Sequence, residues 1–108
     1  MNKITLNQQS YLVDQRLADF TIYQKPSSNV DFFGIDETNK KLFVQFKGGT
    51  GCYIYSDLPE QLLKDIPFAE SIGKLISGIV VKHFPSEKII TRLVIPVGVV
   101  TNAIEPTF

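Results

Sequence analysis

Two tyrosines near the middle of the sequence have the spacing of a pair that could stack on a nucleotide base. Tyr53 and Tyr55 are two residues apart, so both side chains would project from the same face of a strand. Each stack of an aromatic ring on a base contributes about 1–3 kcal/mol. The alternative is structural: the two rings cover the sheet or pack against a helix.

The segment from Ser71 to Lys74 has the groups expected at a phosphate. It stands at the predicted start of a helix, where free N–H groups and the helix dipole favour an anion. Gly73 allows a close approach, and Lys74 adds a positive charge. The alternative is that Ser71 is an ordinary N-cap residue.

Arg92 is a further candidate for contact with a ligand. It stands in the apolar stretch 89–95, where a lone charged side chain usually points to solvent. Its forked guanidinium could instead reach a phosphate across a subunit interface. The predicted ligand-binding residues are therefore Tyr53, Tyr55, Ser71, Gly73, Lys74 and Arg92.

The usual catalytic side chains do not form a recognisable group. The sequence has one cysteine, Cys52, and one histidine, His83. Cys52 has no candidate base beside it and suits a core position, whereas His83 lies on an apolar helix stripe and is expected to be half-buried. A metal site needs three or four suitably spaced ligands. We therefore expect no enzyme activity, no metal and no cofactor.

Three predicted strands and two predicted helices must position these residues. Period-2 patterns and short turns predict strands over 30–35, 42–47 and 52–56, which form a three-stranded antiparallel meander. The glycine-rich connection 48–51 lacks the lysine of a phosphate-binding P-loop. It is expected to be a hairpin connection or a loop that closes over the ligand.

The helices should cover one face of that meander. The sequence from Asp57 to Glu60 predicts a helix entry, and this short helix should end near Ile66. An apolar stripe over 72–84 predicts a second helix, which Pro85 ends. The predicted fold class is therefore α+β: a three-stranded antiparallel meander followed by two helices packed on one face.

The two flanks, 1–26 and 85–108, should add strands to this core within a single domain, 1–108. Phe20–Tyr23 suits a strand after a helical or irregular stretch, and Ile89–Val100 suits one or two strands. The apolar run 93–100 either completes the core or forms an interface between copies of the chain. We expect the interface, and hence a homo-oligomer, because an exposed patch of this size is a liability.

The composition limits the class of partner. The chain has 108 residues, 44 % of them hydrophobic, and its eleven basic and eleven acidic side chains cancel. Proteins that hold duplex DNA usually carry a basic surplus, so duplex DNA is not the expected ligand. The apolar run 93–100 is far shorter than the roughly 20 residues of a membrane helix, and the N-terminus lacks the apolar run of a signal peptide. We expect a cytoplasmic protein without a membrane partner.

Several short segments in the middle of the chain follow one another in a characteristic order: Ser27–Val30, Phe33–Asp36, Leu42–Phe46 with the glycine that follows, Tyr53–Tyr55, Leu58–Pro59, Ser71–Gly73 and Ile79. In this order they resemble the KTSC domain, a module named for its occurrence at the C-terminus of some lysyl-tRNA synthetases. The resemblance covers residues 27–84, and Ile35 and Phe84 depart from it, standing where the family often has tyrosine.

This resemblance implies the fold more than the function. It is to a family that also occurs as single-domain bacterial and phage proteins and that has been suspected of binding RNA. We expect a non-enzymatic protein that binds a small phosphate-bearing nucleotide. If the chain comes from a phage, such binding would suit a sponge that sequesters a cyclic nucleotide signal of bacterial defence. The alternatives are a module that binds short RNA and a structural or protein-interaction domain.

Overall fold

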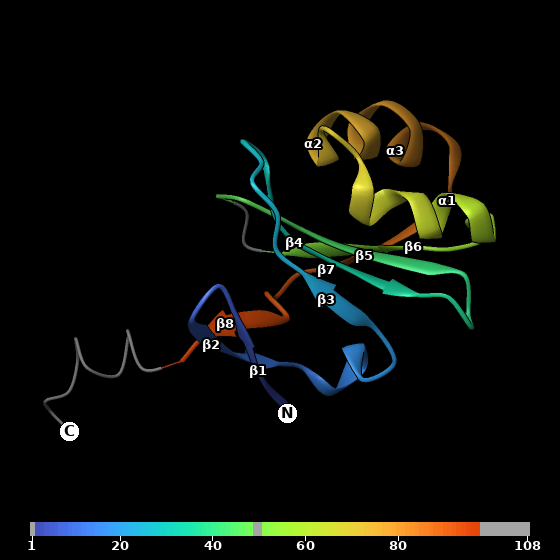
Figure 1. Cartoon of the computed structure of the whole chain (residues 1–108). Helices are drawn as coiled ribbons and strands as arrows, with labels where there is room; N and C mark the ends of the chain where they lie inside the picture. The colour runs from blue at the N-terminus through green and yellow to red at the C-terminus, as the bar shows by residue number, and fades with distance from the viewer. Residues whose placement is uncertain (1, 49–50, 98–108) are drawn as a thin grey trace, which may run out of the picture.

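The computed structural model describes residues 2–48 and 51–97, which form two antiparallel sheets and a helical layer (Figure 1). The five-stranded sheet, in the order β3-β4-β5-β6-β7, lies between the helices and a three-stranded sheet in the order β1-β2-β8. The strands are β1 (Asn2–Leu6), β2 (Gln9–Val13), β3 (Thr21–Tyr23), β4 (Val30–Asp36), β5 (Lys41–Phe46), β6 (Cys52–Tyr55), β7 (Ser86–Ile89) and β8 (Val94–Pro96). The helical segments are the 3-10 turns η1 (Gln15–Leu17) and η2 (Ile66–Phe68), the helices α1 (Glu60–Asp65), α2 (Ile72–Leu75) and α3 (Val81–His83), and the π-helical turn η3 (Ile76–Val80).

The predicted α+β class and the antiparallel meander are confirmed. Strand β5 pairs with β4 on one side and with β6 on the other. Leu42 and Val44 face the helical layer, whereas Phe43 and Gln45 face the three-stranded sheet. All four are 0 % exposed. The meander is therefore buried on both faces, whereas the sequence pattern predicted a cover on one face.

The helical layer buries one row of side chains rather than the whole predicted stripe. Ile72, Ile76 and Val80, which are four residues apart, are 2 %, 0 % and 0 % exposed. Ile79 is 42 % exposed and His83 is also exposed. The π-helical turn η3 has a wider turn than an α-helix, so the row that faces the sheet advances by four residues. The prediction that His83 is a half-buried core residue is therefore wrong.

The described parts of the flanks, 2–26 and 85–97, add five strands. Extra strands were predicted in both flanks, but the boundaries differ from the prediction. The hairpin of β1 and β2 stands where no strand was predicted, and β7 begins before the predicted stretch 89–100. Arg92 lies between β7 and β8 rather than within a strand.

The apolar C-terminal run belongs to the chain's own core as far as the structure describes it. Leu93 and Val94 are both 0 % exposed. They lie in the cluster between the two sheets, with Phe32 and Phe43. Residues 98–100 of the predicted interface lie outside the described residues, and the homo-oligomer stays a prediction.

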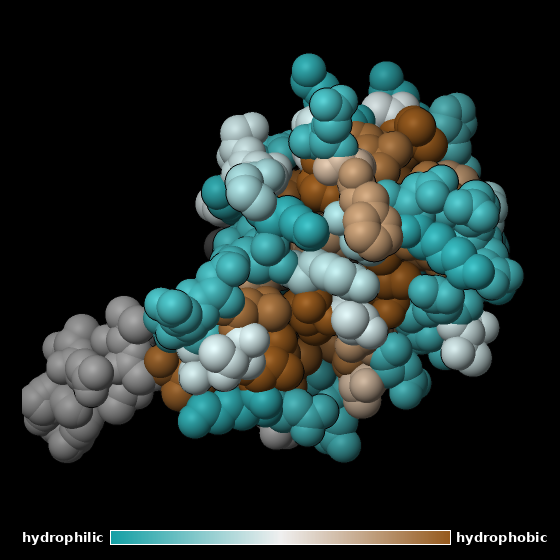
Figure 2. Space-filling model, viewed as in Figure 1, coloured by the Kyte–Doolittle hydropathy of each residue, from teal (hydrophilic) through white to brown (hydrophobic). Residues whose placement is uncertain are grey.

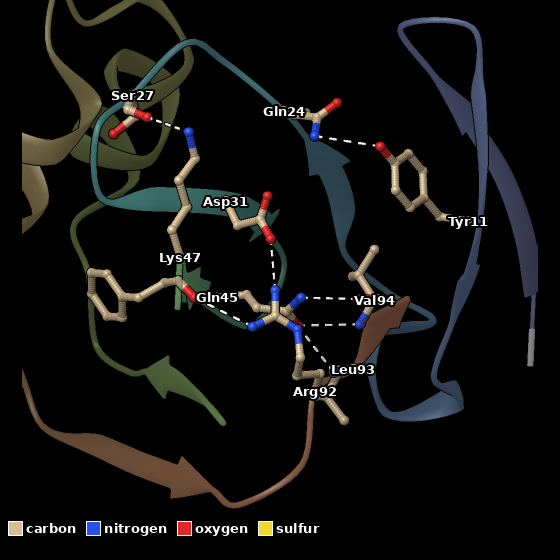
Figure 3. A network of polar contacts seen from close by, with 10 residues as sticks. Tyr11, Gln24, Ser27, Asp31, Gln45, Lys47, Arg92, Leu93 and Val94 are labelled. Carbon is tan, nitrogen blue, oxygen red and sulfur yellow. Dashed lines mark hydrogen bonds and ion pairs between the residues drawn. The ribbon is translucent and has the colours of Figure 1, made fainter. Parts of the chain in front are cut away.

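The buried side-chain amide of Gln45 fastens β8 to the five-stranded sheet (Figure 3). Its Oε1 accepts the N–H of Leu93 at 3.0 Å and the N–H of Val94 at 3.2 Å. Its Nε2 donates to the carbonyl oxygen of Val94 at 2.9 Å. This single amide therefore satisfies backbone groups of Leu93 and Val94 that a neighbouring strand would otherwise bind.

Hydrophobic side chains also reach the surface beside the three-stranded sheet, in the lower part of the view in Figure 2. A cavity of about 350 Å³ lies at β1 and β3, and Ile4, Phe20 and Ile22 are among its lining residues. Its lining carries no formal charge, so this cavity offers nothing that would select a phosphate. Within the described residues, none of the helices is long and apolar enough to cross a membrane.

Candidate ligand-binding site

A polar pocket of about 310 Å³ lies where the loop before β4 meets the start of α2. We call it the serine pocket. It brings together three of the predicted site residues, Ser71, Gly73 and Lys74, with a loop that comes more than forty positions earlier in the chain. The complete lining is Ser27, Ser28, Asn29, Ser71, Gly73, Lys74 and Ser77.

The loop wall of the serine pocket is held by hydrogen bonds of Ser27. The Ser27 hydroxyl accepts the backbone N–H of Asn29 at 3.3 Å and that of Val30 at 3.1 Å. The hydroxyl also donates to Oδ1 of Asn29 at 3.1 Å. These bonds fold the loop into a tight turn just before β4 begins.

Gly73 allows this loop to approach the helix closely. A Cβ atom added at Gly73 would overlap Oδ1 of Asn29 and would lie 3.4 Å from the Ser27 hydroxyl oxygen. The sequence predicted that Gly73 permits a close approach, and the group that approaches is a side chain of the same chain. The two walls of the pocket therefore touch at Gly73.

The helix wall starts with Ser71, which caps α2. Its hydroxyl accepts the backbone N–H of Lys74 at 3.3 Å, so the ordinary N-cap alternative describes its bonding. Lys74 is exposed. Because α2 spans only four residues before the π-helical turn, the side chains of the lining, and not a helix dipole, define the site.

The chemistry of the lining favours an anion. Lys74 is the one formally charged residue of the serine pocket, and the other side chains are hydroxyls and an amide. Ammonium, hydroxyl and amide groups all donate hydrogen bonds, and those from an ammonium to an anionic oxygen are the strongest. A small ligand with a phosphate or carboxylate group meets these donors best.

The predicted pair of stacking tyrosines does not form part of the serine pocket. Tyr55 is 3 % exposed in the core beneath the helices, and this burial raises the pKa of its hydroxyl. Tyr53 is half-buried, and its ring stacks on that of Tyr55 with centroids 6.1 Å apart. The platform of two exposed tyrosines is therefore wrong, because the helical layer covers the sheet face from which both side chains project. The structural alternative describes both residues.

Arg92 is likewise outside the serine pocket. Its guanidinium Nη2 donates to Oδ2 of Asp31 at 2.6 Å, and Nη1 donates to the carbonyl oxygen of Phe46 at 3.5 Å (Figure 3). The side chains of Arg92 and Asp31 are 29 % and 26 % exposed. Arg92 thus does not point freely to solvent, and its predicted contact with a phosphate across a subunit interface stays a prediction.

Four lining residues were not among the predicted site residues: Ser27, Ser28, Asn29 and Ser77. The run from Ser27 to Asn29 had the composition of a turn. Its contact with the helix depends on tertiary packing, which a local pattern does not carry. Ser77 faces the pocket from η3. In the described part of the chain, no group of three potential metal-ligating side chains occurs.

Comparison with known proteins places this pocket within a family. Residues 26–84, more than half of the chain, match the KTSC domain. The chain belongs to the KTSC domain family. The matched range contains the whole lining of the serine pocket. The lysyl-tRNA synthetase connection and the phage source stay predictions.

Two relatives support the assignment to the KTSC family. A protein from Tsukamurella paurometabola is 34 % identical over 58 residues, which are 54 % of this chain and 85 % of that protein. The crystal structure of a KTSC domain protein from Yersinia pestis superposes with a TM-score of 0.59 at 28 % identity. That match covers 65 % of this chain and 97 % of the other. The KTSC fold is therefore shared, and this chain extends beyond the superposed part.

Proposed function

We propose that this KTSC domain binds a small phosphate-bearing nucleotide in the serine pocket. The observation that carries the proposal is that two polar segments, Ser27–Asn29 and Ser71–Lys74, line the same pocket. Each segment alone has an ordinary structural explanation, as a turn and as a helix start. Together they surround a cavity of about 310 Å³ with hydrogen-bond donors and one ammonium group.

Binding without chemical change suits this lining best. Nucleophilic or acid–base catalysis needs an activated nucleophile or a positioned base. The lining as the structure describes it holds serine hydroxyls, an amide and the Lys74 ammonium, with no histidine, cysteine or carboxylate side chain beside them. The phosphate of the ligand would meet Lys74 at the rim, and the ligand would leave unaltered.

The proposal is tested by isothermal titration with nucleoside 5′-monophosphates and cyclic dinucleotides. Lys74→Gln removes the one ammonium group of the pocket and should weaken binding about tenfold, because hydrogen bonds to charged groups contribute about 1.5–3 kcal/mol. Lys82→Gln is the matched control, since Lys82 is an exposed lysine on the same helical run and lies outside the pocket lining. Equal affinities of the two variants would contradict the proposed site.

A second variant tests the pocket by repulsion. Ser77→Asp places a carboxylate on the lining from an exposed position and does not touch the Ser71 cap. It should abolish phosphate binding while the unfolding midpoint stays within a few degrees of the parent. If Ser77→Asp binds as well as the parent, the phosphate lies elsewhere.

The remaining predictions about partners are tested with the same proteins. Native mass spectrometry of the chain with cyclic nucleotides and short RNAs reports the oligomer and the retained ligand in one spectrum. An oligomer that retains an unaltered cyclic nucleotide would support the sponge. Retention of short RNA alone would favour the RNA-binding module, and retention of nothing would favour a structural or protein-interaction domain.

A further inference from the structure

A second polar cavity shares a wall with the serine pocket. It has a volume of about 470 Å³ and lies on the other side of the loop that precedes β4. We call it the lysine pocket, and its lining is Asn7, Gln24, Lys25, Pro26, Asp31 and Lys47. Pro26 lines this pocket and the next residue, Ser27, lines the serine pocket.

Lys47 connects the two pockets. Its side chain lines the lysine pocket, and its Nζ donates to the carbonyl oxygen of Ser27 at 2.6 Å (Figure 3). Its backbone N–H donates to the carbonyl oxygen of Asn29 at 2.8 Å. The ammonium of Lys47 is therefore held at the loop that separates the cavities, with Ser27 and Asn29 on the far side.

The lysine pocket is positive in spite of its carboxylate. Lys25 and Lys47 contribute two positive charges, and Asp31 contributes one negative charge. The carboxylate of Asp31 is already engaged, because Nη2 of Arg92 donates to its Oδ2 at 2.6 Å. Lys25 is exposed, and Lys47 keeps further N–H groups beyond the one that binds the Ser27 carbonyl, so both ammonium groups can meet an anion. The amide of Gln24 also lines this pocket and is held by bonds to Asn7 and Tyr11.

We propose that the ligand carries two phosphates separated by a nucleoside, with one phosphate in the serine pocket and the other in the lysine pocket. The inference rests on the proposed function of the serine pocket. Two cavities with separate ammonium groups and a common wall fit two linked anions, whereas a nucleoside monophosphate would use Lys74 and leave Lys25 and Lys47 without a partner anion. A nucleoside 3′,5′-bisphosphate, a dinucleotide and a segment of single-stranded RNA share this chemistry.

The first experiment compares adenosine 5′-monophosphate with adenosine 3′,5′-bisphosphate by isothermal titration at one fixed salt concentration. The bisphosphate should bind at least about tenfold more tightly, because a second phosphate gains its own charged hydrogen bonds. Lys25→Gln should remove this gain and leave the affinity for the monophosphate unchanged. Lys25 is the better variant than Lys47, because Lys47 also holds the loop of the serine pocket.

Each outcome decides between the two proposals. If the monophosphate binds through Lys74 and the bisphosphate binds no more tightly, the second phosphate site is wrong and the serine pocket stands. If Lys74→Gln leaves the affinity for the monophosphate unchanged, the proposed function is wrong and the two-phosphate ligand with it. Lys82→Gln again serves as the control for a lost surface charge.

Two further probes distinguish the sources of the two phosphates. A cyclic dinucleotide and a ten-nucleotide single-stranded RNA are titrated at two salt concentrations. Equal affinity for the two would show that two linked phosphates suffice. A much higher affinity for the RNA with a steeper salt dependence would show that the pockets belong to a longer path for single-stranded RNA.

Discussion

The amide of Gln45 makes the sharpest stability prediction, because three buried backbone groups depend on it. Val94 faces Val13 in the pairing of β2 with β8, and the bond from the Asp14 N–H to the Leu93 carbonyl flanks that pair. Such a pair is of the non-hydrogen-bonded type, so the N–H and carbonyl of Val94 point away from β2. Gln45 binds both of them and also the N–H of Leu93.

Gln45→Met keeps the length of the side chain and removes all three hydrogen bonds. The methionine fills a similar volume, so the cost comes from the three unpaired backbone groups. At about 1 kcal/mol each, the lower end for a buried unpaired group, the free energy of unfolding falls by about 3 kcal/mol. For a domain of this size the midpoint of thermal unfolding should fall by about 12 °C.

Urea unfolding followed by circular dichroism measures this loss, with Gln61→Met as the control. Gln61 is an exposed glutamine of α1 whose amide donates to Asp65, so its replacement should change the free energy of unfolding by less than about 0.5 kcal/mol. If Gln45→Met is as stable as Gln61→Met, water or a local shift must supply the hydrogen bonds that the backbone groups of Leu93 and Val94 lose. The description of Gln45 as a substitute strand would then be wrong.

Three further predictions concern the pocket loop, the ion pair and the buried thiol. Gly73→Ala should cost about 1–3 kcal/mol, since its Cβ overlaps Oδ1 of Asn29, and should weaken monophosphate binding in titration. Arg92→Met should cost about 1 kcal/mol in urea unfolding by leaving Asp31 unpaired; a loss of monophosphate binding without a loss of stability would contradict the pairing. Burial raises the pKa of the Cys52 thiol, so the folded chain favours the neutral thiol. The stability that the neutral thiol contributes is present below the ordinary thiol pKa of about 8.5 and is lost as the pH rises through the higher pKa of the folded chain. Cys52 should therefore react slowly with iodoacetamide near pH 8.5, and rapid labelling of the folded chain would contradict its burial.

Local patterns predicted the meander because alternation and turn residues act within a few positions of each other. Strands β4, β5 and β6 follow the predicted ranges closely. The same patterns missed the cover on the second face, although Phe43 beside Gln45 was a signal that this face is not solvated. A glutamine in a strand usually marks a solvent face, and here the inner edge of β8 supplies the hydrogen bonds that allow its burial.

The site was predicted to a lesser extent than the fold. Ser71, Gly73 and Lys74 share a pocket because one helix start positions all three, and the sequence shows that start. Tyr53 and Tyr55 failed as a platform because spacing fixes which side chains share a strand face, but not which layer covers that face. Asp31, which pairs with Arg92, comes from β4, sixty-one positions earlier, and no local pattern indicates such a pair.

The two pockets differ in which part of the chain supplies their lining residues, the range matched to the KTSC family or the N-terminal flank. The serine pocket is built wholly from the matched range 26–84. The lysine pocket needs Asn7, Gln24 and Lys25 from the N-terminal flank together with Asp31 and Lys47 from the matched range. A KTSC domain without this flank would keep every lining residue of the serine pocket but would lack half of the lining of the lysine pocket. If the two pockets hold two phosphates as proposed, the flank is the part of this chain that distinguishes a ligand with two phosphates from a ligand with one.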